Sequence, residues 1–218
     1  MVERTPLIFL IFAGLIFMVF VMMLISVLPH QTVVFTDEED EISEGIQEYD
    51  PVLGDKNAPI VITHYSDFLC ESCAETATSL SNIVEDYPDE IAIVWKDFPN
   101  VSAHPLAPGA SIAARCAGEQ GEFWAYHDLL FTYQRDITTE TAAEYYMLIS
   151  EELDLGSWRF NRCVNKQQTF EDLEASYADA NALELTASPT ITVNDERFSG
   201  SMSENEIRSV ILNLELTF

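Results

Sequence analysis

The sequence predicts an α/β domain that follows one membrane-spanning helix. Three observations support this: an uncharged apolar run at residues 7–28, a β-branched run at residues 60–63 that leads into two cysteines, and a helical block that ends in a hairpin and a last helix. A chain of 218 residues with 48% hydrophobic content can form one well-buried domain plus attachments. We therefore expect a single globular domain.

The first predicted element is a transmembrane helix. Residues 7–28 carry no charge and one polar side chain, Ser26, and about 20 apolar residues suffice to cross a bilayer. The length of the run and the lack of a small-residue cleavage site favour an uncleaved signal anchor over a cleaved signal peptide. Because Arg4 is the only basic residue before the run, we assign residues 1–6 to the cytoplasm and residues 7–29 to a single-pass anchor in the cell membrane. The rest of the chain is then expected on the extracytoplasmic side, where disulfides persist.

Residues 30–50 are predicted to form an acidic tether. The stretch "TDEEDEISEGIQEYD", residues 36–50, has eight carboxylates and no cation, and such a block repels itself and stays extended. The whole chain has 37 acidic and 10 basic side chains, for a net charge of -27. This charge argues against nucleic acid as a partner, because phosphate binding needs clustered Lys and Arg. It favours either adaptation to salt, which would screen the repulsion, or simple solubility.

The predicted domain, residues 51–218, begins with a strand, a helix and a second strand. The β-branched run at residues 60–63 is typical of a buried strand. Apolar residues at helical spacing follow the cysteines, namely Ala77, Leu80, Val84 and Tyr87. This spacing places Cys70 near a helix N-terminus and Cys73 in its first turn. The segment "EIAIVWKDF", residues 90–98, is the second predicted strand.

Helical patterns then fill the region from about residue 104 to residue 185. They form a block of four or five helices, with candidate segments at residues 105–119, 122–134, 138–155, 157–165 and 169–185. The segment "SPTITVNDERFSG" reads as a hairpin that turns near Asn194. A last helix follows, with Ser203 as its N-cap and Glu206 three residues later.

Cys70 and Cys73 have the C-x-x-C spacing used for redox chemistry, for metal binding or for a small structural loop. A helix N-terminus stabilises a thiolate, so Cys70 is expected to attack and Cys73 to resolve the mixed disulfide. Structural zinc needs four ligands, and Cys116 and Cys163 have no close ligand partner in the sequence. A bond between Cys70 and Cys73 would close too small a loop to add much stability. Redox chemistry without a cofactor or metal is therefore favoured.

Three segments in order resemble the DsbA-like branch of the thioredoxin superfamily. They read "VLGDKNAPIVITHYSDFLCESCAE", "KDFPNVSAHPLAPGASIAARCAGEQGEFWAYHDLLF" and "SPTITVND". The resemblance covers nearly all of residues 50–218. It implies a thioredoxin-like fold with an inserted helical domain, which fits the 116 positions between Cys73 and Pro189. It also implies that Pro189 is a cis-proline facing the cysteine pair, the alternative being an ordinary trans proline that opens a strand.

The resemblance further implies a function. The chain is expected to form, reduce or reshuffle protein disulfides, with protein thiols or disulfides as substrates and an unidentified redox partner that recycles the cysteines. The backbone of Ser188 would pair with an incoming peptide beside Cys70. The competing hypothesis is a non-enzymatic scaffold or metal-handling protein that uses the cysteine pair as ligands.

The sequence departs from the family pattern at the active site. Glu71 and Ser72 replace the proline and histidine that strongly oxidising members carry between the cysteines. An anion at Glu71 should favour the Cys70 thiol, and hence a more reducing couple. His64 occupies the strand position where the superfamily usually has a buried acid. It is expected to act either as a base toward Cys73 or as a hydrogen-bonded core histidine.

The remaining candidates have less specific signals. Cys116 and Cys163 fall on two predicted helices of the insert, and the expected state is a structural disulfide that pins those helices, the alternatives being a second redox relay or two free thiols. Lys96 is a candidate charge partner for the redox centre, and His104 has no neighbour in the sequence that suggests a site. An aromatic run that includes Tyr126 is expected to be core packing rather than a substrate groove.

Overall fold

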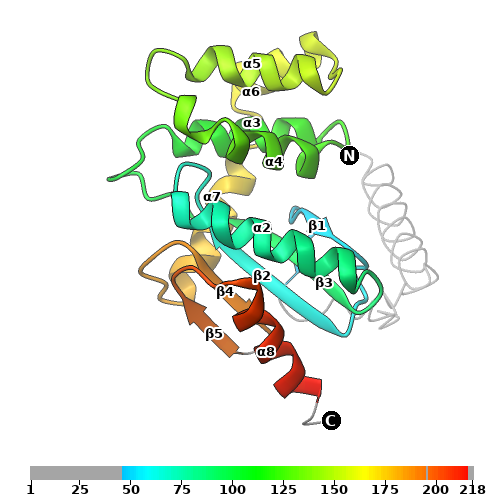
Figure 1. The fold of residues 1–218 in the computed structure, drawn as a ribbon. Helices are drawn as coiled ribbons and strands as arrows, with labels where there is room; N and C mark the ends of the chain where they lie inside the picture. The colour runs from blue at the N-terminus through cyan, green and yellow to red at the C-terminus, as the bar shows by residue number, and fades with distance from the viewer. Residues whose placement is uncertain (1–45, 195, 216–218) are drawn as a thin grey trace, which may run out of the picture. The chain divides into compact units, whose positions relative to one another are not determined.

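A five-stranded sheet organises the domain. The computed structural model describes residues 46–194 and 196–215. Its strand order is β1-β3-β2-β4-β5, as Figure 1 shows. The central strands β2 (Ile60–Ser66) and β3 (Ile91–Asp97) run parallel, and the other pairings are antiparallel. The remaining strands are β1 (Val52–Leu53) and β5 (Glu196–Ser199) at the two edges and β4 (Thr190–Val193) between β2 and β5.

Helices cover both faces of this sheet. Helices α2 (Glu71–Asp86) and α8 (Glu204–Glu215) lie over one face, where Ile62 packs in the same cluster as Leu80 of α2. Helix α7 (Phe170–Ala182) lies over the other face, where Tyr65 packs with Ala180. Because side chains alternate across a strand, His64 shares the α2 face with Ile62. The sheet therefore holds His64 beneath the helix that starts at the cysteines.

The inserted helices lie between β3 and β4 in the chain. They comprise α3 (Ala107–Gly118), α4 (Phe123–Thr132), the 3-10 turn η1 (Gln134–Asp136), α5 (Ala142–Glu152), α6 (Ser157–Lys166) and α7. A buried cluster joins them to Phe68, just before the cysteines, and to Trp95 of β3. This observation confirms the predicted helical insert and the order of strand, helix, strand, helical block, hairpin and helix. The short strand β1 and the turn η1 were not predicted.

The domain begins earlier than residue 51. Ile46 and Asp50 are buried, and an Asp50 carboxylate oxygen lies 2.7 Å from Lys96 Nζ. The Tyr49 carbonyl accepts a hydrogen bond from Arg115. The tether boundary predicted at residue 50 was therefore wrong for residues 46–50, because a buried lysine gives the last carboxylate of the acidic run a partner inside the domain.

The predicted membrane anchor, residues 7–29, lies outside the described residues. Among the helices that the structure does describe, none combines the length and apolar character that crossing a bilayer requires.

Candidate active site

Cys70 and Cys73 lie at the start of helix α2. Cys70 is the N-cap residue, with an extended backbone (φ -91°, ψ 120°) and no side-chain cap hydrogen bond. The backbone N–H of Cys73 donates to the Cys70 carbonyl at 3.1 Å. Cys70 is 8% exposed and Cys73 is fully buried, and both thiols are free. Cys70 is therefore the cysteine that a substrate reaches first.

The two thiols have opposite acidities. A hydrogen bond from the Cys73 thiol lowers the pKa of Cys70 to about 6, and the Ser72 hydroxyl lies 3.1 Å from Cys70 Sγ. Burial raises the pKa of Cys73 well above its usual range. The less buried sulfur, of Cys70, is thus prepared as a thiolate, while the sulfur of Cys73 keeps its proton. This asymmetry supports the predicted roles of nucleophile for Cys70 and resolving thiol for Cys73.

The expected effect of Glu71 on this thiol was wrong. Its carboxylate is largely exposed and pairs with the guanidinium of Arg135, and the pKa of Cys70 is lowered, chiefly by Cys73. Since an exposed carboxylate beside a cation has little field left to act on the sulfur, Glu71 does not hold Cys70 in the thiol form. Arg135 lies 64 positions away from Glu71 in the chain, so this ion pair could not be predicted from the sequence.

The Ser188–Pro189 peptide bond is cis. Pro189 is buried directly before β4, and the Ser188 carbonyl oxygen lies 3.8 Å from Cys70 Sγ. The cis bond that the family resemblance implies is therefore present, and it faces the more exposed cysteine. Beside Cys70 the chain thus presents a backbone carbonyl, the type of group that pairs with an extended peptide.

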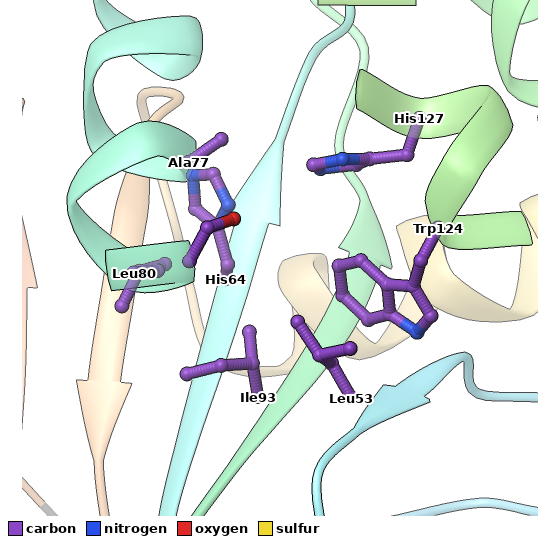
Figure 2. A pocket seen from close by; sticks show the side chains of 8 residues that line it. Leu53, His64, Ala77, Leu80, Ile93, Trp124 and His127 are labelled. Atoms are coloured by element: carbon purple, nitrogen blue, oxygen red, sulfur yellow. The ribbon is translucent and has the colours of Figure 1, made fainter. Parts of the chain in front are cut away.

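His64 lies in the core beneath helix α2. It lines a small cavity with Ala77 and Leu80 of α2 and with Trp124 and His127 of α4, as Figure 2 shows. Burial, and then the nearby His127, lower the pKa of His64 to about 3. Its Nε2 atom is buried without a hydrogen-bond partner among the described residues. The alternative of a hydrogen-bonded core histidine therefore does not describe the Nε2 atom. The lowered pKa keeps His64 in the neutral form near pH 7.

Asp67 and His104 organise the loop before Cys70. Asp67 is buried and accepts hydrogen bonds from the backbone N–H groups of Leu69 at 2.7 Å and Asn100 at 2.8 Å. Its second oxygen also lies 2.8 Å from His104 Nδ1. His104 has no partner nearby in the sequence, because Asp67 is 37 positions away. The only local signal was an aspartate three residues before the N-cap cysteine.

Lys96 is not a charge partner of the cysteines. Its ammonium group lies 2.7 Å from the Asp50 carboxylate and 2.6 Å from that of Asp179. Lys96 follows Trp95 of β3, so its side chain belongs to the α7 face of the sheet, away from α2. The prediction was wrong because Lys96 belongs to the second strand of the motif but lies on the face of the sheet that does not carry the cysteines.

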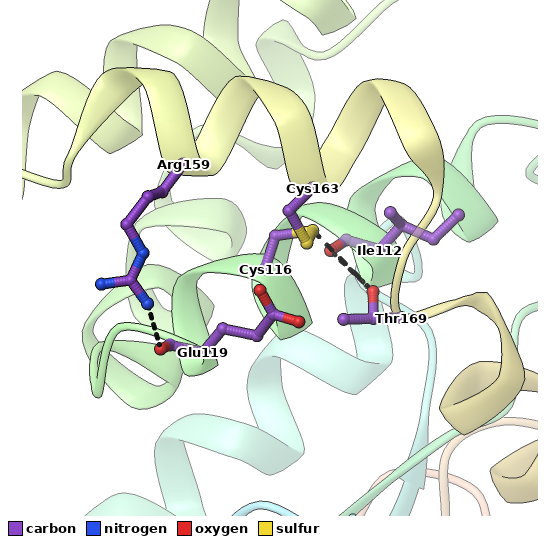
Figure 3. Close-up of a disulfide and its surroundings, with 6 residues drawn as sticks. All are labelled: Ile112, Cys116, Glu119, Arg159, Cys163 and Thr169. Carbon is purple, nitrogen blue, oxygen red and sulfur yellow. Dashed lines mark hydrogen bonds between the residues drawn. A yellow bond between two sulfur atoms is a disulfide. The ribbon is translucent and has the colours of Figure 1, made fainter.

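Cys116 and Cys163 form a disulfide between helices α3 and α6, as Figure 3 shows. Both residues are fully buried. The Thr169 hydroxyl lies 3.9 Å from Cys116 Sγ and 3.4 Å from the Ile112 carbonyl. Of the three states left open by the sequence, the paired state is the one present, and its burial suits a structural role.

The predicted core role of the aromatic run is confirmed. Tyr126 is fully buried, and its hydroxyl donates to the Tyr146 carbonyl at 2.8 Å.

Across residues 46–194 and 196–215, no group of three or more His, Cys, Asp or Glu side chains is placed to hold a metal ion.

A comparison with known families matches residues 47–213 to the thioredoxin family. The chain belongs to the thioredoxin family. Among solved structures, this thioredoxin-family chain is similar to BdbD from Bacillus subtilis, with a TM-score of 0.68 and 19% identity over 76% of this chain and 92% of that one. It is also similar to α-DsbA1 from Wolbachia pipientis, with a TM-score of 0.66 and 22% identity over 78% and 92% of the two chains. Its fold is that of the DsbA-like thiol-disulfide oxidoreductases.

Curated relatives of this thioredoxin-family chain are much longer proteins. It is 31% identical over 153 residues to a protein named Na(+)/H(+) antiporter NhaA 1 from Mycolicibacterium gilvum, and the match covers 70% of this chain and 24% of that protein. A protein of the same name from Salinispora arenicola is 29% identical, with 78% and 26% covered. The chain thus spans about a quarter of the length of these relatives.

Proposed function

We propose that the chain is a protein thiol-disulfide oxidoreductase that works through Cys70 and Cys73. The observation that carries the proposal is the position of Cys70: its thiol has a lowered pKa at the N-terminus of α2 and faces the Ser188 carbonyl across the cis bond to Pro189. Thiol–disulfide exchange with a cysteine-containing chain uses two groups. One is a nucleophilic sulfur, and the other is a backbone carbonyl that pairs with the substrate peptide.

In the oxidising direction, a substrate thiolate attacks Cys70 Sγ of the Cys70–Cys73 disulfide. That sulfur–sulfur bond breaks, Cys73 leaves as a thiolate and takes up a proton, and a mixed disulfide forms. A second substrate thiolate then attacks the substrate sulfur of the mixed disulfide and releases Cys70 as a thiolate. The substrate loses two electrons, and the cysteine pair gains them.

In the reducing direction, the Cys70 thiolate attacks a substrate disulfide and Cys73 resolves the mixed disulfide. Cys73 must lose its proton in that step, and we include His64 as the group that accepts it transiently. Its support is its place beneath α2 and its unpartnered Nε2 atom. The physiological direction depends on the redox partner that recycles the pair.

We further propose that residues 7–29 anchor the domain in the cell membrane, with the catalytic part outside the cytoplasm. The support is the uncharged apolar run and the internal disulfide, a bond typical of oxidising compartments. Sodium and proton antiport, which the names of the curated relatives state, is not part of this proposal, since the chain spans only about a quarter of those proteins.

Insulin reduction and the oxidative refolding of a reduced substrate test the proposed activity. The wild-type chain should perform at least one of the two, and Cys70→Ser should perform neither. A metal-handling or scaffold protein would show no exchange, and the Cys70→Ser variant would then match the wild type. Zinc titration of the reduced chain, with Cys116 and Cys163 still paired, checks that alternative directly.

A further inference from the structure

The turn η1 of the inserted domain contacts the active-site loop. The side-chain amide of Gln134 donates one hydrogen bond to the Phe68 carbonyl at 2.7 Å and one to the Cys70 carbonyl at 2.9 Å. The next residue of the turn, Arg135, pairs with Glu71. Both contacts cross more than 60 positions of sequence and join the insert to the C-x-x-C segment.

The carbonyl of Cys70 is a sensitive place for such a contact. It accepts the first hydrogen bonds of α2, from Cys73 N–H at 3.1 Å and Ala74 N–H at 3.3 Å. Cys70 itself makes no side-chain cap hydrogen bond. The Gln134 amide therefore holds the N-cap residue from outside the helix, at the junction where the chain turns into α2.

The same amide alters the electrostatics around the sulfur. Carbonyl oxygens carry negative partial charge, and two of them, from Phe68 and Cys70, lie in the segment that bears the Cys70 thiol. Donation by Gln134 offsets part of that charge. It also keeps the Cys70 backbone where the N-terminal N–H groups of α2 act on the sulfur. Both effects favour the thiolate over the thiol.

We propose that Gln134 is a positioning residue for thiol–disulfide exchange: its amide fixes the carbonyls of Phe68 and Cys70, so that the inserted helical domain sets the reactivity of Cys70. This role rests on the proposed oxidoreductase function, and it assigns a part of the exchange chemistry to a residue outside the strand, helix and cis-proline that surround the cysteines.

Gln134→Met is the first test, because methionine has a similar length and no N–H donor. We expect the thiolate titration of Cys70, followed by ultraviolet absorbance, to move to higher pH by about one unit. The equilibrium constant for reduction of the Cys70–Cys73 disulfide by two glutathione molecules should fall about tenfold in parallel, because the reduced protein loses stabilisation of its thiolate. Values equal to those of the wild type in both measurements would overturn the proposal.

Gln120→Met is the matched control. Gln120 belongs to the same insert, and its side-chain oxygen accepts a hydrogen bond from the Gly156 backbone at 2.9 Å. Loss of this contact should lower the unfolding temperature without moving the thiolate titration or the glutathione equilibrium. If Gln120→Met shifts both redox measurements as far as Gln134→Met does, the effect is general destabilisation and the positioning role is wrong.

Gln134→Glu keeps the proposal testable if the methionine variant does not fold. An ionised carboxylate at this position is repelled by the two carbonyl oxygens, whereas a protonated carboxyl group can donate one hydrogen bond to them. We expect its glutathione equilibrium constant, relative to the wild type at the same pH, to recover in acid and to fall several-fold above neutrality. A ratio that does not change with pH would overturn the proposal.

These outcomes are separate from failure of the proposed function. A wild-type chain that exchanges neither with insulin nor with glutathione would end the oxidoreductase proposal itself. If the wild-type chain exchanges normally and the Gln134 variants behave like the wild type, only the proposed role of Gln134 is wrong.

Discussion

At the scale of single residues, the lowered pKa of Cys70 predicts the redox potential of the pair. That pKa is about 6, between the values of about 3.5 for DsbA and about 7 for thioredoxin. A difference of about 2.5 units from DsbA corresponds to roughly 3.4 kcal/mol, or roughly 70 mV. Thioredoxin, with a thiol pKa of about 7 and a potential of about -270 mV, gives about -240 mV by the same conversion. We therefore expect a potential between about -190 and about -240 mV, more reducing than DsbA at about -120 mV. Equilibration with glutathione measures it, and a value close to that of DsbA would contradict the assignment.

The same thiol predicts how the stability of the reduced protein depends on pH. Its folded pKa is lowered to about 6 from an ordinary value of 9.0. A lowered acid pKa contributes stability above the unfolded pKa and loses it as pH falls through the folded value. The free energy of unfolding of the reduced form should therefore rise by about 3 kcal/mol between about pH 6 and pH 9.

Urea unfolding of the dithiol form at several pH values measures this rise. The raised pKa of Cys73 acts in the opposite sense only above pH 9, and the lowered pKa of His64 adds a smaller rise that ends near pH 7, so the part of the rise between pH 7 and pH 9 reports Cys70. The Cys70→Ser variant is the control and should lose this part of the pH dependence. A reduced wild-type protein whose stability does not rise in this window would show that Cys70 is not acidic.

His64 gives a second prediction at this scale. With a pKa of about 3, its imidazole is neutral near pH 7 and can hold the Cys73 proton only transiently. Because a base with a pKa of about 3 is weak near neutrality, replacing His64 with Ala should slow resolution of a trapped mixed disulfide by less than about 100-fold, the lower end of the contributions from general bases tuned to the operating pH.

Leu80→Ala is the control for His64, since Leu80 lines the same cavity and carries no titratable group. It should alter stability but leave the pH profile of resolution unchanged. If His64→Ala also keeps the wild-type profile, the histidine is a core residue and bulk solvent takes the proton.

The candidate site shows which residues could be predicted from the sequence. Cys70 and Cys73 carry a local spacing, and Pro189 was identified from the family segment around it. Gln134 and His104 carry no such signal, because each acts only through long-range hydrogen bonds to a loop 37 or more positions away. Pattern-based prediction finds chemistry that is encoded by neighbours in the chain, and it misses partners that only the folded chain brings together.

At the scale of elements, the insert was predicted from helical periodicity and the strands from β-branched runs. Strand β1 was missed because two residues, Val52 and Leu53, are too short for a periodic signal; pairing with β3 makes them a strand. The first residue of the turn η1, Gln134, was predicted as the end of the preceding helix, and the other two residues were assigned to no element. Both misses are segments whose conformation depends on tertiary contacts rather than on local pattern.

The disulfide between α3 and α6 gives a prediction at this scale. It closes a loop of 47 positions, so replacing Cys116 and Cys163 together with Ala should lower the free energy of unfolding by about 2 to 4 kcal/mol. Calorimetry or urea unfolding of the variant measures this loss.

Because this pair is buried in the insert and is separate from Cys70, the glutathione equilibrium of the active-site pair should be unchanged in the alanine variant. A large shift of that equilibrium would indicate that the disulfide acts as a second redox relay. The sequence left this alternative open.

At the scale of the whole molecule, the net charge of -27 predicts a response to salt. Self-repulsion in a compact acidic domain is screened within about 8 to 10 Å at physiological ionic strength and over shorter distances in concentrated salt. The unfolding midpoint should therefore rise as KCl is added from low to molar concentration. A flat profile would favour simple solubility as the reason for the acidity.

The entry of the chain into the domain has a mechanical consequence. Residues 46–50 join the fold through the buried pair of Asp50 and Lys96 and through the bond from Arg115 to the Tyr49 carbonyl, directly before β1 pairs with β3. A pull on the preceding segment would load these buried contacts at the side of the sheet that carries β1. The cysteines lie at the start of α2, directly after β2, so β3 stands between them and the strand that such a pull would load first.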